Sequence, residues 1–516
     1  MDPSLRWGDG MMGGISLTPG SVSLGELRAV WNGAGVTLSQ QGWSALDAAA
    51  LSVARIVASG ATVYGVNTGF GLLAQTRIAD DRLEELQRNL ILSHSCGLGE
   101  ALDRRIVRLA IALKAIGLGR GHSGVRPVVV ERLLALVEAD ALPLIPSQGS
   151  VGASGDLAPL AHLAAPLIGE GKIVLGGEVV PAAEALARLG LEPLVLGPKE
   201  GLALINGTQI STAIALDTLF TAERVFASGL IAGAMSLDAL KGTDAAFDPR
   251  IHQARGQPGQ IAVAALLKQL LDGSEIRHSH EDCPRVQDPY SFRCQPQVMG
   301  AALDLMRHVA RTLEIEANAV TDNPVVFPDA DESLSGGNFH AQPVAFAADM
   351  LTMALCEIGS ISERRAAVLI DPKMSGLPPF LVQDSGVNSG FMIAQVTAAA
   401  LVSENKSLAW PASVDTIPTS AGQEDHVSMA THAATKARRV AANAAGVVGI
   451  ELLCAAQGLD FHAPLTSSPA VEAARSEIRR NVAHYASDRY LADDLEWAKA
   501  AVMAGTLSKQ VEGALF

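Results

Sequence analysis

The segment Gly149-Ser-Val-Gly-Ala-Ser-Gly-Asp-Leu-Ala-Pro-Leu160 interrupts the helical pattern of the N-terminal half of the chain. A glycine-rich turn followed by a helix, with Asp156 near the helix start, is the simplest structural interpretation. A phosphate-binding loop fits the segment less well, because the segment has no Gly-Lys-Ser/Thr sequence and Asp156 would repel phosphate. The residue types also permit a chemical interpretation.

The tripeptide Ala153-Ser154-Gly155 carries what an internal cyclisation requires. The Gly155 amide nitrogen can attack the Ala153 carbonyl carbon, and loss of water from the ring and from Ser154 leaves 4-methylidene-imidazol-5-one (MIO), a strong electrophile. Gly155 has no Cβ to block the sharp bend, and a rigid surround can hold the strain. Ser154 supplies the leaving hydroxyl, and Ala153 is small enough for the backbone to fold on itself.

Helical periodicity dominates on both sides of this segment. In the N-terminal half, the pattern predicts helices at 46–58, 80–92, 101–118 and 127–138, and a small hairpin at 169–180. Further along, it predicts long helices, poor in charge over much of their length, at 208–241, 296–320, 344–368, 390–408 and 424–459. A helix that is apolar nearly all round must be buried on most sides. The sequence therefore predicts a mainly α protein with a long central helical bundle whose outer faces meet other subunits.

The change along the chain from mixed loops and helices to long helices poor in charge predicts a division into consecutive domains. Residues 1–15 are expected to form a flexible tail, and residues 16–206 an N-terminal domain of mixed loops and helices that carries the 149–160 segment. Residues 207–470 are expected to form the central bundle, and residues 471–516 a C-terminal helical segment.

Composition narrows the class of protein. With 39 Lys and Arg against 54 Asp and Glu, the net charge of −15 leaves no basic excess for nucleic acid. The charge-free stretches 56–76 and 385–403 contain Gly, Asn, Gln and Thr, so neither is expected to span a membrane. The N-terminus has no apolar signal core, which predicts a cytoplasmic protein.

The five cysteines are scattered, and no Cys-x-x-Cys pair occurs, so reduced thiols and no structural zinc are expected. The tract His278-Ser-His-Glu-Asp-Cys283 has metal-binding residue types but lacks a distant matching pair. The sequence therefore predicts no bound metal.

Further motifs follow an ordered arrangement along the chain. They are Tyr64-Gly-Val-Asn-Thr-Gly-Phe-Gly71, Gly201-Leu-Ala-Leu-Ile-Asn-Gly-Thr208, Val286-Gln-Asp-Pro-Tyr-Ser-Phe-Arg-Cys-Gln-Pro296, Gly336-Gly-Asn-Phe-His340 and Gln423-Glu-Asp-His-Val-Ser428. Together with the 149–160 segment they resemble the aromatic amino acid ammonia-lyase family, from roughly Leu24 to the C-terminal region. The resemblance implies a fumarase/aspartase-like helical architecture and a carbon–nitrogen lyase. It also implies MIO formed from Ala153-Ser154-Gly155, without metal or diffusible cofactor, and a homotetramer whose active sites are shared between subunits.

The resemblance assigns roles to individual residues. Tyr64 matches the candidate base for the unactivated β proton of the substrate, and Tyr290 is expected near the prosthetic group; which of the two is the sole base stays open. Arg293, one helical turn from Tyr290, matches the partner of the substrate carboxylate, for which a planar guanidinium is suited. The remaining matches are Asn206, which bonds and helps to form the prosthetic group, Asp156, linked to ring formation or to helix capping, and the pocket residues Gln287 and Phe339.

Substrate choice is predicted from Ser93, His94 and Glu424. An imidazole at position 94 can hydrogen-bond a polar substrate ring. Phenylalanine-specific relatives typically carry Gln in place of Glu424, and a carboxylate would hold the ring proton of an imidazole but would be desolvated at a cost beside a phenyl ring. Both features favour L-histidine, whose non-oxidative deamination gives trans-urocanate and ammonia in histidine degradation.

Alternatives remain from the sequence alone. A 2,3-aminomutase or a tyrosine or phenylalanine ammonia-lyase would use the same prosthetic group, and an inactive helical scaffold protein would need none. Glu424 could also be a negative charge at the start of a helix, where it would interact favourably with the helix dipole.

Overall fold

The computed structural model describes residues 14–59, 63, 65, 67–69, 78–280, 286–508 and 511. The chain forms two compact units, each assembled from three stretches of sequence. Unit 1 comprises Met1–Asp217, Ala310–Ala348 and Pro411–Thr435, and unit 2 comprises Thr218–Val309, Asp349–Trp410 and Lys436–Phe516. Both units are thus discontinuous, whereas the division predicted from the sequence is linear.

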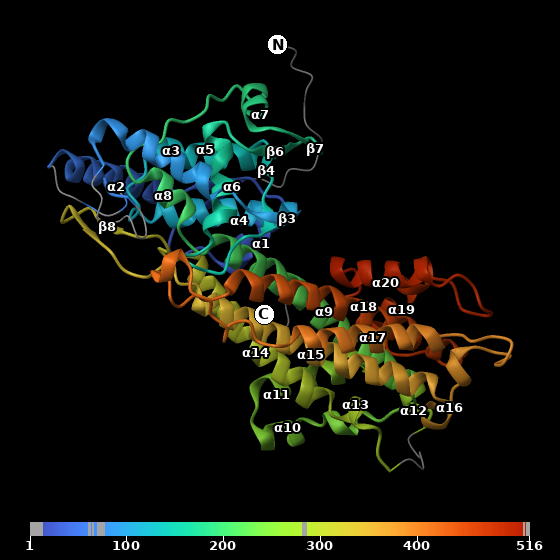
Figure 1. Ribbon diagram of the computed structural model, residues 1–516. Helices are drawn as coiled ribbons and strands as arrows, with labels where there is room; N and C mark the ends of the chain where they lie inside the picture. The colour runs from blue at the N-terminus through green and yellow to red at the C-terminus, as the bar shows by residue number, and fades with distance from the viewer. Residues whose placement is uncertain are drawn as a thin grey trace. The chain divides into compact units, whose positions relative to one another are not determined.

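Unit 1 holds the described strands and the helices of the N-terminal part of the chain (Figure 1). Its helices up to residue 205 are α1 (Leu24–Trp31), α2 (Gln40–Ala58), α3 (Leu83–His94), α4 (Arg104–Gly119), α5 (Pro127–Glu138), α6 (Leu157–Ala164), α7 (Ala182–Arg188) and α8 (Glu200–Ile205). Helix α4 packs against α1, α2 and α5, and every residue from 106 to 119 is buried. Helix α4 is therefore the core helix of unit 1.

The strands of unit 1 form small sheets. Strand β1 (Ile15–Leu17) pairs in parallel with β2 (Val36–Leu38), and β3 (Leu98–Ala101) pairs antiparallel with β5 (Pro146–Gln148). Strand β4 (Leu142–Pro143) lies beside β6 (Lys172–Leu175), which pairs with β7 (Glu178–Pro181), and β8 (Val325–Phe327) pairs with β9 (Glu332–Leu334). The β6–β7 pair, closed by Gly176 and Gly177 at φ 59° and 85°, is the hairpin expected at 169–180.

The predicted long helices form, and the fold is mainly α (Figure 1). They are α9 (Gln209–Ala239), α14 (Gln295–Ala317), α15 (Gln342–Ile370), α17 (Met392–Leu408) and α18 (Ala430–Asp460). In unit 2, a Cβ built on Gly229 of α9 would lie 3.5 Å from side-chain atoms of Met299 and Ile358 and 3.8 Å from Val448. Four long helices therefore meet closely around this glycine.

The shorter helices of unit 2 complete the bundle. They are α10 (Pro249–Arg255), α11 (Pro258–Leu270), α12 (Glu275–His278), α13 (Tyr290–Arg293), α16 (Pro372–Ser375), α19 (Pro469–Asn481) and α20 (Ala492–Ala504). Two long helices, α15 and α18, are long and apolar enough to cross a membrane by length and composition alone. Because 67% and 89% of their most apolar windows are buried inside the protein, both have the burial expected of core helices.

The predicted helix at 424–459 is wrong at its N-terminal end, since α18 begins only at Ala430. Ser420, Ala421 and Met429 have φ values of 50°, 55° and 56°, in the left-handed region that a right-handed helix cannot use. Thr419 and Glu424 instead pair through their backbones, N–H to O, at 2.9 and 3.3 Å. Glu424 and His426 are consequently loop residues and not helix residues.

Candidate active site

The Ala153-Ser154-Gly155 tripeptide lies in the loop between β5 and α6, where the backbone is strained. Ser154, a residue with a Cβ, has φ 52°, and Gly152 and Gly155 both have φ 78°. Ser150 Oγ donates to the Gly155 carbonyl at 3.3 Å, and the Gly155 N–H donates to the Gly152 carbonyl at 3.4 Å. The loop therefore folds back on itself at the tripeptide.

Gly155 is held against Gly207 by the backbone. The two residues form an isolated parallel bridge, and the Asp156 N–H donates to the Gly207 carbonyl at 2.8 Å. A Cβ on Gly155 would lie 2.2 Å from the Gly207 oxygen, a distance that real Cβ contacts do not show. Only glycine fits position 155 without moving one of the two segments.

Asn206 binds the tripeptide directly. It ends α8, and its Nδ2 donates to the Ser154 carbonyl oxygen at 2.7 Å. Asn206 is buried, with 2% of its surface exposed. Its side-chain amide therefore lies on the carbonyl that would become the ring carbonyl of MIO.

Asp156 joins segments that are far apart in sequence. Its fully buried carboxylate accepts from the Ser211 N–H at 2.8 Å, from Ser211 Oγ at 2.9 Å and from Thr431 Oγ1 at 2.7 Å. Burial raises the pKa of Asp156, and these hydrogen bonds oppose the rise. Asp156 is the N-cap residue of α6 but makes no side-chain capping bond there. Its carboxylate therefore binds Ser211 and Thr431 and does not cap its own helix.

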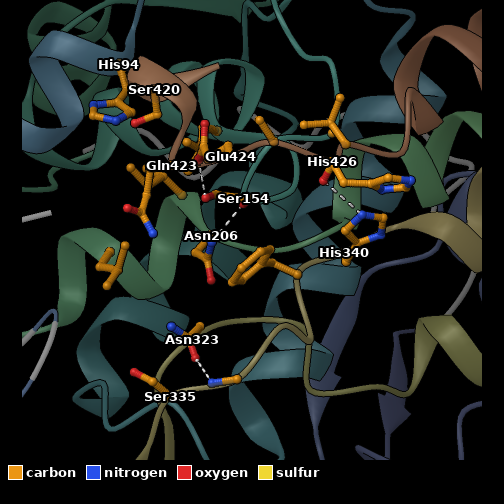
Figure 2. A pocket seen from close by; sticks show the side chains of 18 of the residues that line it. His94, Ser154, Asn206, Asn323, Ser335, His340, Ser420, Gln423, Glu424 and His426 are labelled. Carbon is orange, nitrogen blue, oxygen red and sulfur yellow. Dashed lines mark hydrogen bonds between the residues drawn. The ribbon is translucent and has the colours of Figure 1, made fainter. Parts of the chain in front are cut away.

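Glu424 reaches Ser154 from the loop before α18. Ser154 Oγ donates to Glu424 Oε1 at 2.5 Å, and Thr419 Oγ1 donates to Glu424 Oε2 at 2.8 Å. Figure 2 shows Glu424 and Asn206 on opposite sides of Ser154. The hydroxyl and the carbonyl of Ser154 are thus each bound by a different segment of unit 1.

A cavity of about 690 Å³ opens beside these residues, and all of its lining comes from unit 1 (Figure 2). The lining includes the predicted residues Ala153, Ser154, His94, Asn206, Phe339 and Glu424. It also includes residues that have no role assigned in the sequence analysis: Asn323, Ser335, His340, Gln423, Asp425 and His426. The His340 and His426 rings stack with centroids 5.6 Å apart, a contact that nothing in their local sequence indicates.

His94 contributes the end of α3 to the cavity. Its Nδ1 lies 2.8 Å from the Leu90 carbonyl oxygen, and because a carbonyl only accepts, Nδ1 carries the proton. Burial lowers the pKa of His94, while this bond and the charge of Glu424 oppose the shift. Neutral His94 therefore keeps Nε2 as an acceptor. Ser93 bonds to the Leu90 carbonyl at 3.3 Å and does not line the cavity.

Comparison with known proteins identifies the family of the chain. The family model for aromatic amino acid lyases matches residues 22–480. The chain belongs to the aromatic amino acid lyase family. It is therefore a carbon–nitrogen lyase with the helical fold of that family.

Individual members of the aromatic amino acid lyase family are similar over nearly the whole chain. A histidine ammonia-lyase from Paracidovorax citrulli (strain AAC00-1) is 59% identical over 499 residues, which cover 96% of this chain and 98% of that protein. The crystal structure of histidine ammonia-lyase from Trypanosoma cruzi is 40% identical with a TM-score of 0.90, covering 97% of this chain and 96% of its own. A tyrosine aminomutase from Streptomyces globisporus is 35% identical with a TM-score of 0.92, covering 96% and 98%.

Membership of this lyase family implies the MIO group, and the loop geometry fits it. The tripeptide is bent at positive φ, Gly155 is packed where no Cβ fits, and the Ser154 carbonyl already has a donor in Asn206. A Cβ on Gly152, which has φ 78°, would also meet the Ser428 side-chain oxygen at 2.2 Å, so the entry to the loop is closely packed too. Ala153, Ser154 and Gly155 are the residues that would form the group.

Several of the predicted lyase residues that the structure describes are not among those lining this cavity. Gln287, Tyr290 and Arg293 belong to unit 2, where the Arg293 guanidinium lies 4.3 Å from the Tyr290 ring centroid. Tyr290 is 71% exposed and lines a second cavity, of about 410 Å³, with Arg364 and other residues of unit 2. Tyr64 lies outside the described residues, so its predicted role as base stays a prediction.

The histidine-rich tract at 278–283 is only partly described. Among the described residues no three His, Cys, Asp or Glu side chains gather as a metal site. The His280 ring nitrogens lie 2.9 Å from the Ile276 carbonyl oxygen and 3.2 Å from that of Gly242, which gives this side chain a structural role.

Proposed function

We propose that the chain catalyses the non-oxidative deamination of L-histidine to trans-urocanate and ammonia; a 59% identical relative is named histidine ammonia-lyase. The observation that carries this proposal is the carboxylate of Glu424, which borders the cavity and touches Ser154 Oγ at 2.5 Å. A carboxylate beside the reacting residue suits a substrate ring that carries N–H groups, whereas a phenyl ring would leave it desolvated and unpaired.

Two residues of the cavity are suited to hold the imidazole ring. Glu424 accepts a hydrogen bond from a ring N–H, because an ionised carboxylate has only acceptors. Neutral His94 offers Nε2 as a second acceptor, or a donor once it is protonated. Both side chains line the cavity together with Ser154 (Figure 2). The ring would therefore be placed next to the tripeptide.

Asn206 is suited to assist the tripeptide itself. MIO supplies an electrophilic methylidene carbon, derived from Ser154 Cβ. The Asn206 amide donates to the Ser154 carbonyl oxygen at 2.7 Å, where it stabilises negative charge that develops on that oxygen. Its Oδ1 is buried and has no hydrogen-bond partner in the described part of the chain, so it is available to accept from the substrate ammonium.

The base and the carboxylate partner are assigned by family resemblance. Tyr64 would remove the β proton, with Tyr290 near the prosthetic group, and Arg293 would bind the substrate carboxylate with Gln287 nearby. Because Gln287, Tyr290 and Arg293 belong to unit 2 and are not among the residues that line the cavity of unit 1, we infer that some of these groups reach it from other subunits of a homotetramer. A cytoplasmic place in histidine degradation completes the proposal.

The test is incubation of the purified chain with L-histidine while urocanate absorbance and ammonia are followed. Tyrosine and phenylalanine are run in parallel, and Ser154→Ala serves as the blank. The intact mass of the wild type should fall short of the unmodified chain by two water molecules. A β-amino acid product without urocanate would instead identify an aminomutase. Turnover of tyrosine or phenylalanine above that of L-histidine would contradict the proposed substrate.

A further inference from the structure

Lys114 is a buried lysine in an unusual place. It lies on α4, the core helix of unit 1, and only 1% of its surface is exposed. The neighbouring residues of α4 are mostly apolar, so the helix could have carried a leucine or methionine at this position. A buried ammonium is disfavoured unless its N–H groups are bound, and the partners of this one point to a role.

The amine of Lys114 binds the end of α8. Its Nζ donates to the Asn206 carbonyl at 2.8 Å and to the Ala203 carbonyl at 3.1 Å. Carbonyls at the C-terminal end of a helix have no partner within the helix, and this amine supplies one. Lys114 therefore fixes the backbone at the point where α8 ends and Asn206 begins its extended conformation.

The segment that Lys114 binds contacts the loop that carries Ala153-Ser154-Gly155. The side chain of Asn206 donates to the Ser154 carbonyl, and the next residue, Gly207, pairs with Gly155 and accepts from the Asp156 N–H. The segment 206–207 is thus bound by Lys114 on one side and by the loop on the other. A shift of this segment would move the Asn206 amide off the Ser154 carbonyl.

The dehydration of Ser154 depends on that carbonyl. The Cα–H and Cβ–Oγ bonds break, the Cα–Cβ double bond forms, and the proton and the hydroxide leave as one water. As the Cα proton leaves, negative charge develops on the Ser154 carbonyl oxygen, and a donor placed there lowers the barrier. We propose that Lys114 is a positioning residue for this step, because it holds Asn206 where its amide meets the Ser154 carbonyl.

The charge state of Lys114 is compatible with this role. Burial lowers its pKa to about 7; the charges of Asp322 and Asp156 oppose the shift, and that of Lys199 adds to it. A neutral amine still has two N–H donors, which are enough for the two carbonyls. Positioning through hydrogen bonds should therefore persist on both sides of neutral pH.

The experiment compares maturation in Lys114→Met with a matched buried lysine. Lys199→Met is the control, because Lys199 is also fully buried but pairs with Asp322 at 2.8 Å rather than with the Asn206 segment. The readout is the rate at which the intact mass loses two waters. Lys114→Met should mature about tenfold more slowly or worse, whereas Lys199→Met should mature like the wild type even if its Tm falls.

Further measurements separate positioning from general stability. Lys114→Gln, which keeps N–H donors on a shorter side chain, should recover part of the maturation rate at pH values on both sides of neutrality. In matured chains of Lys114→Met, kcat should fall more than KM for L-histidine rises. Maturation of Lys114→Met at the wild-type rate, or equal slowing by Lys199→Met, overturns the proposal. If Lys114→Met does not fold, Lys114→Gln and Lys114→Arg are measured, and failure of all three assigns Lys114 to folding and overturns the positioning role.

The inference rests on the proposed function only in assuming that the tripeptide matures. If the wild-type chain loses two waters but produces no urocanate, L-histidine is not the substrate. The role of Lys114 is then tested by the rate of mass loss alone. Normal urocanate production with unimpaired maturation of Lys114→Met refutes only the role of Lys114.

Discussion

The Ser154 hydroxyl donates a 2.5 Å hydrogen bond to Glu424 Oε1, although the two residues are 270 positions apart in the chain. Thr419 Oγ1 binds the other carboxylate oxygen at 2.8 Å and fixes its direction. One carboxylate thereby contacts the residue that would become the electrophile and borders the cavity in which a substrate ring would lie. Removing its charge should change substrate choice more than stability.

Glu424→Gln tests this expectation. It keeps the size of the side chain but deletes the charge, and losing one charged hydrogen bond costs about 1.5–3 kcal/mol, or roughly ten- to over a hundredfold in kcat/KM for L-histidine. Residual reaction with phenylalanine should change much less. Asp425→Asn, a neighbouring charge that also lines the cavity, is the control and should have a smaller effect. Equal losses for both substrates would argue against contact with the ring.

Gly155→Ala should block maturation. The added Cβ would lie 2.2 Å from the Gly207 oxygen at a residue with φ 78°, so one of the two segments must move. The intact mass should show no loss of water, and activity should be absent. Gly177→Ala in the β6–β7 hairpin is the control, because it has φ 85° with open space around it and should cost only about 1–2 kcal/mol. A matured Gly155→Ala chain would contradict the packing argument.

The pKa of His94 should lie below its ordinary value of 6.5, because burial disfavours the charged ring. The folded chain then binds fewer protons at this residue than the unfolded chain as the pH approaches 6.5 from below. This residue's contribution to stability therefore rises with pH in that window and is complete above it. NMR of isotope-labelled histidine, assigned with His94→Asn, measures the value.

Glu424→Gln should lower the pKa of His94 further, since the charge of Glu424 raises it in the wild type. Asp425→Asn should leave it nearly unchanged. A His94 pKa at its ordinary value would show that burial does not control this ring, and a higher pKa in Glu424→Gln would show that the charge of Glu424 does not raise it.

The shared-site proposal predicts complementation between inactive chains. Tyr64→Phe and Arg293→Ala should each lose most activity, and a mixture dissociated and reassembled together should regain part of it if the two residues act from different subunits. Light scattering should show an assembly of four chains. An active monomer near 53.6 kDa would refute the proposal.

Part of the structure could be predicted because its signals are local. Helical periodicity located α9, α14, α15 and α17 within a few residues, and the glycine pair at 176–177 located the β6–β7 hairpin. The prediction failed before α18, where the non-glycine residues Ser420, Ala421 and Met429 adopt positive φ beside Gly422. Tertiary contacts such as the Glu424–Ser154 bond hold that loop, and no short window of sequence contains them.

The site was predictable to a similar extent. Motif resemblance selected Ser154, Asn206, His94 and Glu424, which the structure brings to one cavity. It did not indicate the stacked pair His340 and His426, because those residues meet only through the fold. Nor could spacing show that Asp156 turns from its own helix toward Ser211 and Thr431, since those partners are 55 and 275 positions away.

The carboxylate of Asp156 connects the loop to the starts of two long helices. Because it accepts from the backbone N–H of Ser211 near the start of α9, that amide can exchange with solvent only when this contact breaks. Thr431 at the start of α18 shares the same acceptor group, so local fluctuation of either helix end is coupled to the loop. The exchange rate of a single amide therefore reports how often the residues that flank the tripeptide come apart.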